Sequence, residues 1–120
     1  MCMLDRKLRG FGYALKGLRI ASREESNFRV QIILGSLAIL AGIFLHITRI
    51  EWLFVIGAAG LVLTAELLNT ALEELCDMLK PTHDPHVAKI KDLSAGAVFA
   101  ASVTALLIGC IIFLPYIFTL

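Results

Sequence analysis

Four polar side chains recur at helical spacing in an otherwise apolar stretch of the sequence. Glu66, Asn69, Glu73 and Asp77 follow one another at intervals of three or four residues. At about 100° per residue they lie within roughly 80° of one another on one face of an α-helix. Placing carboxylates in an apolar helix costs free energy unless they face protein, a cation or water. A functional role for these residues is therefore the default interpretation. Hydrogen bonding to neighbouring helices, which polar side chains in membrane spans commonly provide, is the structural alternative.

Charged residues also stand shortly before the first and third apolar runs of the chain. Glu25 precedes the first run, and Lys91 and Asp92 precede the third. Proteins usually hold Mg²⁺ through one or two carboxylates together with substrate phosphates. We therefore expect Glu25 and Glu73 to bind Mg²⁺, and Lys91 to contact a phosphate as a point charge. Glu66, the deepest acid, would accept a proton from a hydroxyl presented from the lipid. These parts suit phosphoryl transfer at a membrane surface.

The runs that must position these residues are too apolar for a soluble protein of this size. Of the 120 residues, 58% are hydrophobic and the mean hydropathy is +0.83, whereas soluble domains are roughly 45 to 50% apolar. No acidic or basic residue occurs within 32–45, 52–65 or 93–114. We predict an all-α membrane protein in which a single membrane-embedded domain covers 1–120. Its three transmembrane helices are expected at about 30–47, 52–79 and 93–114.

The segment before the first span predicts an amphipathic surface helix over about 4–22. Its apolar residues form one stripe, at Leu4, Leu8, Phe11, Leu15 and Leu18. Arg9, Lys16 and Arg23 fall on the other side, so the helix can lie in the membrane interface with its cations near anionic headgroups. Packing against protein produces the same periodicity and remains the alternative. Seven of the eleven basic residues precede the first span, so the positive-inside rule predicts a cytoplasmic amino terminus.

Two common kinds of site find no support in the sequence. Gly12 to Gly17 has the glycine spacing of a P-loop, but Leu18 stands where that motif requires Lys. Cys2, Cys76 and Cys110 are widely spaced and contain no C-x-x-C pair. Neither a disulfide framework nor a zinc site is therefore favoured.

Several segments in order resemble one known family. The most specific is A-E-L-L-N-T-A-L-E over 65–73, with Asp77 four residues further on. Supporting segments are Y-A-L-K-G-L-R over 13–19, E-S-N-F-R over 25–29 and A-K-I-K-D-L-S-A-G-A-V over 88–98. Together they resemble the prokaryotic diacylglycerol kinase family, which includes the undecaprenol kinases of Gram-positive bacteria.

The resemblance implies an ATP- and Mg²⁺-dependent kinase that phosphorylates the primary hydroxyl of a membrane lipid alcohol, either diacylglycerol or undecaprenol. It implies a homotrimer in the bacterial inner membrane, with active sites shared between neighbouring subunits. ATP and the lipid would be its partners, and nucleic acid would not.

The resemblance also implies roles for individual residues. Glu66 would be the general base for the lipid hydroxyl, and Glu25 with Glu73 would hold the Mg²⁺ of MgATP. The further nucleotide-binding residues would be Arg6, Tyr13, Lys91 and Asp92. Support of the site would come from Asn69 and Asp77. Substrate contacts besides Glu66 would come from Arg6, Arg19, Asn27 and Arg29.

Two other functions remain open at this point. A small proton-coupled transporter could use Glu66 as its membrane-embedded acid, and would move solute in sealed vesicles without consuming ATP. A non-catalytic assembly subunit could use the glycines of the spans for close helix contact. Charge-removing changes at Glu25 and Glu73 would then alter assembly rather than chemistry.

Overall fold

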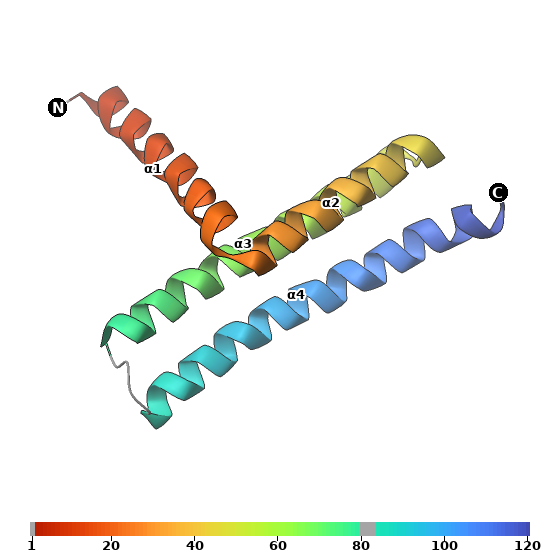
Figure 1. The fold of residues 1–120 in the computed structure, drawn as a ribbon. Coiled ribbons are helices and arrows are strands. Elements are labelled where there is room, and N and C mark those ends of the chain that lie inside the picture. The colour runs from red at the N-terminus through yellow and green to blue at the C-terminus, as the bar shows by residue number, and fades with distance from the viewer. Residues whose placement is uncertain (1, 80–83) are drawn as a thin grey trace.

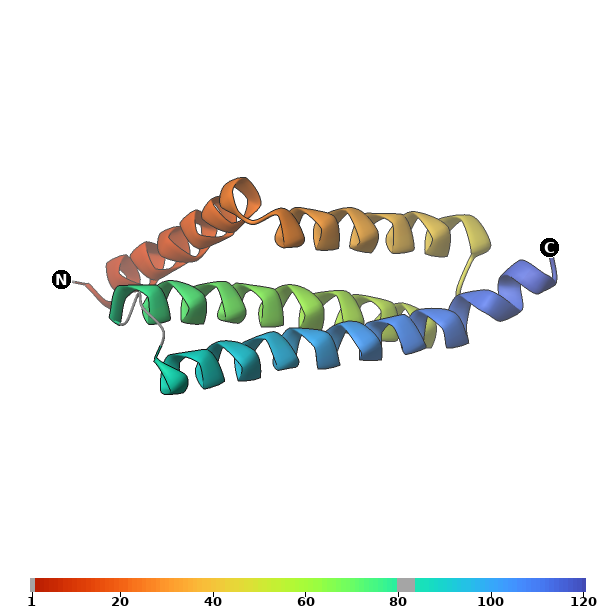
Figure 2. The ribbon, with the colours of Figure 1, turned by 60° about the horizontal axis from the view of Figure 1, so that its bottom comes forward.

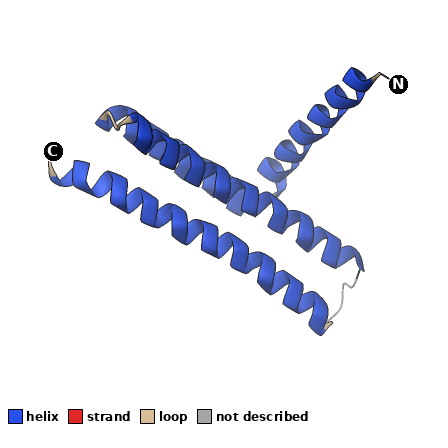
Figure 3. Ribbon diagram, turned by 180° about the vertical axis from the view of Figure 1, so that it is seen from behind, coloured by secondary structure: helices blue, strands red, loops and turns tan. Residues whose placement is uncertain are grey.

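The structure is a computed structural model that describes residues 2–79 and 84–120. Within these residues the chain is helical and contains no strand (Figures 1 and 3). The helices are α1 (Met3–Glu24), α2 (Ser26–Leu45), α3 (Arg49–Leu79) and α4 (Pro85–Phe118). By length and composition, α2, α3 and α4 can each cross a membrane. The predicted all-α fold, with three spans after an amino-terminal helix, is confirmed.

The three long helices lie side by side, with α3 between α2 and α4 (Figure 2). The most extensive packing is between α3 and α4, and α2 also packs against α3. Helix α1 diverges from this bundle (Figure 1), and residues 2–20 are all exposed. We call the end of the bundle that holds Glu25, Glu73 and Lys91 the charged end.

A single extended residue, Glu25, separates α1 from α2. The guanidinium of Arg29 donates hydrogen bonds from Nη1 to the carbonyl oxygens of Ser22 (3.2 Å) and Arg23 (2.9 Å). These carbonyls belong to the last turn of α1, where carbonyl groups have no amide partner within the helix. Helix α2 therefore begins at Ser26, four residues before the predicted start of the first span.

Hydrogen bonds at the opposite end of the bundle join α3 to α4. Thr48 and Glu51 form a capping box, in which the Thr48 amide donates to Glu51 Oε1 (2.9 Å) and the Glu51 amide donates to Thr48 Oγ1 (3.2 Å). The hydroxyl of Tyr116 donates to the same Glu51 oxygen. The expectation that the third helix ends before Pro115 is wrong, because α4 continues to Phe118. Proline removes one helical hydrogen bond, which kinks a helix without necessarily ending it.

Close packing around Gly42 predicts a large effect of a small substitution. A Cβ atom at Gly42 would lie 2.8 Å from Trp52 Cη2 and 3.0 Å from Ile47 Cδ1. We expect Gly42→Ala to destabilise the protein by about 1–3 kcal/mol through overpacking, measured as a lower Tm in detergent. Gly57→Ala is the matched control, since nothing lies within 4 Å of the corresponding Cβ position. Equal Tm values for the two variants would contradict this packing.

Candidate active site

The polar stripe of α3 passes from the bundle interior to its charged end. Glu66 is buried, with 2% of its surface exposed. Asn69 and Glu73 are half-buried, and Asp77 is exposed. The backbone of a long amphipathic helix thus places one acid among apolar side chains and a second about ten ångströms nearer the surface, at 1.5 Å per residue.

A third carboxylate comes close to this stripe from the corner between α1 and α2. Half-buried Glu25 occupies that corner, and both helices that it joins pack against α3. The described residues contain no group of three or more His, Cys, Asp or Glu side chains placed to hold a metal ion. Two carboxylates nevertheless suffice for Mg²⁺ when phosphate oxygens and water complete its shell. The chemistry of this pair therefore fits Mg²⁺.

Ser94 of α4 extends the stripe into a chain of hydrogen bonds. Its hydroxyl donates to Asn69 Oδ1 (2.8 Å), and Asn69 Nδ2 donates to Glu73 Oε1 (3.3 Å). Ser94 is buried, with 6% of its surface exposed. Ser94 is not among the site residues predicted from the sequence, although its position three residues after Lys91 places both on one helix face.

Lys91 and Asp77 form the second link between α3 and α4. Lys91 Nζ lies 2.6 Å from Asp77 Oδ1, and both side chains are solvent-accessible. An exposed ion pair adds little to stability. Its main consequence is geometric, because it holds the Lys91 ammonium group at the charged end near Glu73.

The structure does not bring the other predicted residues to this stripe within one chain. Arg6, Tyr13 and Arg19 lie exposed on α1, and Asn27 and Asp92 are exposed on α2 and α4. Among the described residues, none of the five makes a hydrogen bond or ion pair with the stripe.

Arg29 forms its side-chain hydrogen bonds with the end of α1. Its guanidinium bonds the last carbonyls of α1, as described above. These bonds hold the side chain against the end of α1.

Comparison with known proteins assigns the chain to a family. The model of the family described as prokaryotic diacylglycerol kinase matches residues 12–113. The undecaprenol kinase of Bacillus subtilis is 33% identical over 112 residues, which cover 93% of this chain and 91% of the relative. The diacylglycerol kinase of Escherichia coli K12 is 30% identical over 107 residues, covering 89% and 88%. That of Synechocystis is 36% identical over 111 residues, covering 92% and 63%.

These matches favour the kinase over the transporter and the assembly subunit considered above. They also agree with three helices that can each cross a membrane. The chain belongs to the prokaryotic diacylglycerol kinase family and is a multi-pass membrane lipid kinase.

Proposed function

We propose that the protein transfers the γ-phosphoryl group of ATP to the primary hydroxyl of a membrane lipid alcohol, diacylglycerol or undecaprenol. The relatives carry both substrates in their names. The observation that supports the proposal best is a buried acid, Glu66, on the same helix face as a half-buried acid nearer the surface, Glu73. Such a pair suits a hydroxyl that arrives from lipid and a phosphate that arrives from water.

Glu66 would act as the general base. The lipid hydroxyl would attack the γ-phosphorus in line while the Glu66 carboxylate takes its proton, and ADP would leave toward the aqueous side. Enzymatic phosphoryl transfer depends mainly on positioning and on charge stabilisation. Few protein groups are therefore needed beyond those that orient the hydroxyl and hold the phosphates.

Glu25 and Glu73 would hold Mg²⁺, which when bound neutralises charge on the phosphates. Lys91, oriented by Asp77 (2.6 Å), would contact a phosphate oxygen. The remaining nucleotide contacts would come from Arg6, Tyr13 and Asp92. Those to the lipid headgroup would come from Arg6, Arg19, Asn27 and Arg29.

The divergence of α1 supports a homotrimer with shared sites. Residues 2–20 are exposed, so Arg6 and Tyr13 are available to complete the nucleotide site of a neighbouring subunit. Six of the eleven basic residues precede α2 and a seventh, Arg29, lies in its first turn, which favours a cytoplasmic amino terminus. We place the protein in the bacterial inner membrane, where cytoplasmic ATP can reach the charged end.

The hydrogen-bond chain through Asn69 predicts a positioning role for Ser94. Ser94→Ala removes the bond to Asn69 Oδ1 and frees the amide to rotate, so Glu73 loses a fixed partner. We expect the KM for MgATP to rise about five- to tenfold, the effect of one hydrogen bond, with a smaller change in kcat. Ser94→Thr, which keeps the hydroxyl, should restore most of the affinity. A lower Tm with an unchanged KM would instead indicate a purely structural serine.

One experiment tests the function as a whole. Purified protein in mixed micelles is incubated with Mg²⁺, radiolabelled ATP and either diacylglycerol or undecaprenol. We expect at least one lipid to be labelled. Because micelles hold no ion gradient, this labelling would also distinguish a kinase from a proton-coupled transporter. Labelling of neither, by protein shown to be folded, would refute the proposal.

A further inference from the structure

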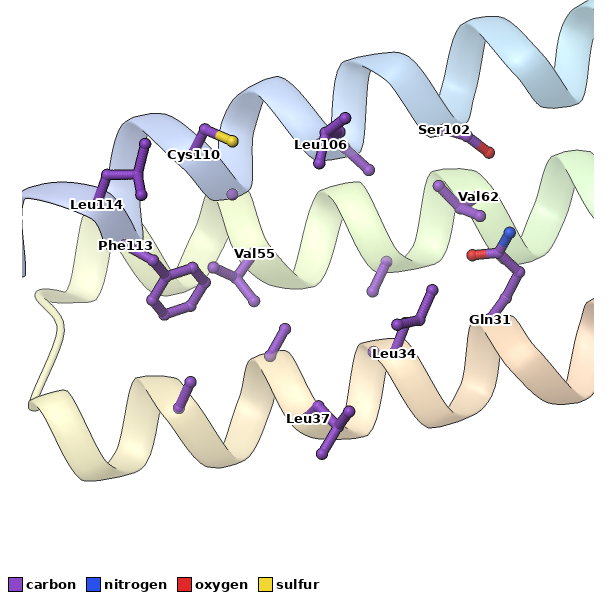
Figure 4. A pocket seen from close by; sticks show the side chains of 16 residues that line it. Gln31, Leu34, Leu37, Val55, Val62, Ser102, Leu106, Cys110, Phe113 and Leu114 are labelled. Atoms are coloured by element: carbon purple, nitrogen blue, oxygen red, sulfur yellow. The ribbon is translucent and has the colours of Figure 1, made fainter. Parts of the chain in front are cut away.

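A cavity of about 650 Å³ lies between α2, α3 and α4 (Figure 4). Its lining is mostly apolar, and many of the lining residues are glycine or alanine. Two polar side chains interrupt this lining, Gln31 from α2 and Ser102 from α4. Figure 4 shows both at the same end of the cavity, near Val62, while Phe113 and Val55 lie toward the other end.

The floor of the cavity belongs to the same stripe of α3 as the proposed base. The floor residues Val55, Ala59 and Val62 are followed by Glu66 at successive spacings of four, three and four residues. Residues at these spacings share one helix face. The end of the cavity at Val62 is therefore one helical turn from Glu66 on the same face of α3.

The contact between α2 and α3 fixes the depth of Gln31. A Cβ atom at Gly35 would lie 3.8 Å from Ala59 Cβ, so these two residues are level in antiparallel helices. Gln31 lies four residues nearer the charged end than Gly35, and Val62 lies three residues nearer than Ala59. Gln31 and Val62 are therefore at nearly the same depth.

The hydrogen bond from Ser94 to Asn69 fixes the depth of Ser102 in the same way. Ser102 lies eight residues farther from the charged end than Ser94, which brings it level with Val62. Val62 is four residues, one helical turn, before Glu66. The two polar side chains thus lie about 6 Å deeper than the proposed base.

Both side chains have hydrogen-bonding capacity to offer a ligand. Several helical hydroxyls donate a hydrogen bond to a carbonyl of the preceding turn, namely those of Ser22, Thr70 and Thr104. Ser102 does not, and neither Ser102 nor Gln31 has a hydrogen-bond partner within residues 2–79 and 84–120. Each is half-buried, at a depth where lipid offers little water as a substitute.

We propose that the cavity holds a hydrocarbon chain of the substrate and that Gln31 and Ser102 donate hydrogen bonds to an ester carbonyl of that substrate. This inference rests on the proposed function and selects between its two lipids. Diacylglycerol carries ester carbonyls within a few atoms of its free hydroxyl, whereas undecaprenol has only hydrocarbon at that distance. A site built to bond a polar group discriminates against an analogue that lacks it, because its own polar groups are then left unpaired.

The test compares dioleoylglycerol, its diether analogue and undecaprenol as substrates of the purified protein with MgATP. The diether keeps the hydroxyl and both chains but replaces the ester groups with ether oxygens. We expect the wild type to use the diester with a kcat/KM at least about tenfold above the diether, the effect of one or two hydrogen bonds. Undecaprenol should be the poorer substrate.

Two variants test whether Gln31 and Ser102 cause the preference for the diester over the diether. Gln31→Leu and Ser102→Ala should each lower kcat/KM for the diester by about five- to tenfold and lower it much less for the diether. A Tm in detergent equal to that of the wild type would show that both variants fold. Ser36→Ala is the matched control, an exposed serine of α2 outside the cavity lining. This control should leave kcat/KM unchanged for both substrates.

The experiment distinguishes failure of this inference from failure of the proposed kinase function. Equal use of diester and diether by the wild type, a preference for undecaprenol, or equal losses on both glycerolipids in the variants would overturn this inference and leave the kinase function intact. Labelling of no lipid would overturn both.

Discussion

Replacing Glu66 by Gln is expected to lower the rate of lipid phosphorylation by about 10²- to 10⁴-fold, the range typical of a lost general base. The amide keeps the size of the side chain but cannot take the proton of the attacking hydroxyl. Because Glu66 is 2% exposed, solvent has little access to replace it. Initial rates with radiolabelled ATP measure the effect, and MgATP binding to the same variant should be retained.

Glu74→Gln provides the matched control for this change. Glu74 is exposed and lies on a different face of the same helix, so the same loss of charge should leave the rate near that of the wild type. Near-normal turnover by correctly folded Glu66→Gln would show that Glu66 is not the base.

The helices were predictable because the membrane leaves the backbone few alternatives. In lipid each amide and carbonyl must be satisfied within its own helix, so a long run without charges, such as 93–114, implies a span. Helix ends were less predictable. Helix α4 begins at Pro85 because Asp84 Oδ1 accepts hydrogen bonds from the amides of His86 (2.8 Å) and Val87 (3.4 Å), a local cap that hydropathy does not register. The sequence K-P-T-H-D-P over 80–85 is also expected to break the helix, and its residues 80–83 lie outside the described residues.

The candidate site was predictable where one helix defines it. Glu66, Asn69 and Glu73 share a face by the period of the helix alone. Ser94 and Ser102 became relevant only through the register of α4 against α3, which is set by side-chain packing and not by any pattern within one segment. Contacts that α1 would make with a nucleotide remain predictions, because they depend on how subunits assemble.

Two pairs of adjacent glutamates allow the Mg²⁺ assignment to be tested with internal controls. In each pair one residue is half-buried, Glu25 or Glu73, and its neighbour is exposed, Glu24 or Glu74. Removing a metal ligand should raise the Mg²⁺ concentration for half-maximal activity by at least about tenfold, since even outer-shell partners of a metal contribute 10- to 100-fold. We expect this shift for Glu25→Gln and Glu73→Gln, and no shift for Glu24→Gln and Glu74→Gln.

The double variant decides whether both carboxylates hold the same ion. Residues that act on one ligand are energetically coupled, so the effects of Glu25→Gln and Glu73→Gln should combine to less than their product. Glu25 and Glu73 are both half-buried at the charged end, which makes independent effects unexpected. Fully multiplicative effects, or Mg²⁺ requirements that stay at the wild-type value while kcat falls, would mean that the two acids shape the field around Glu66 and do not bind the metal.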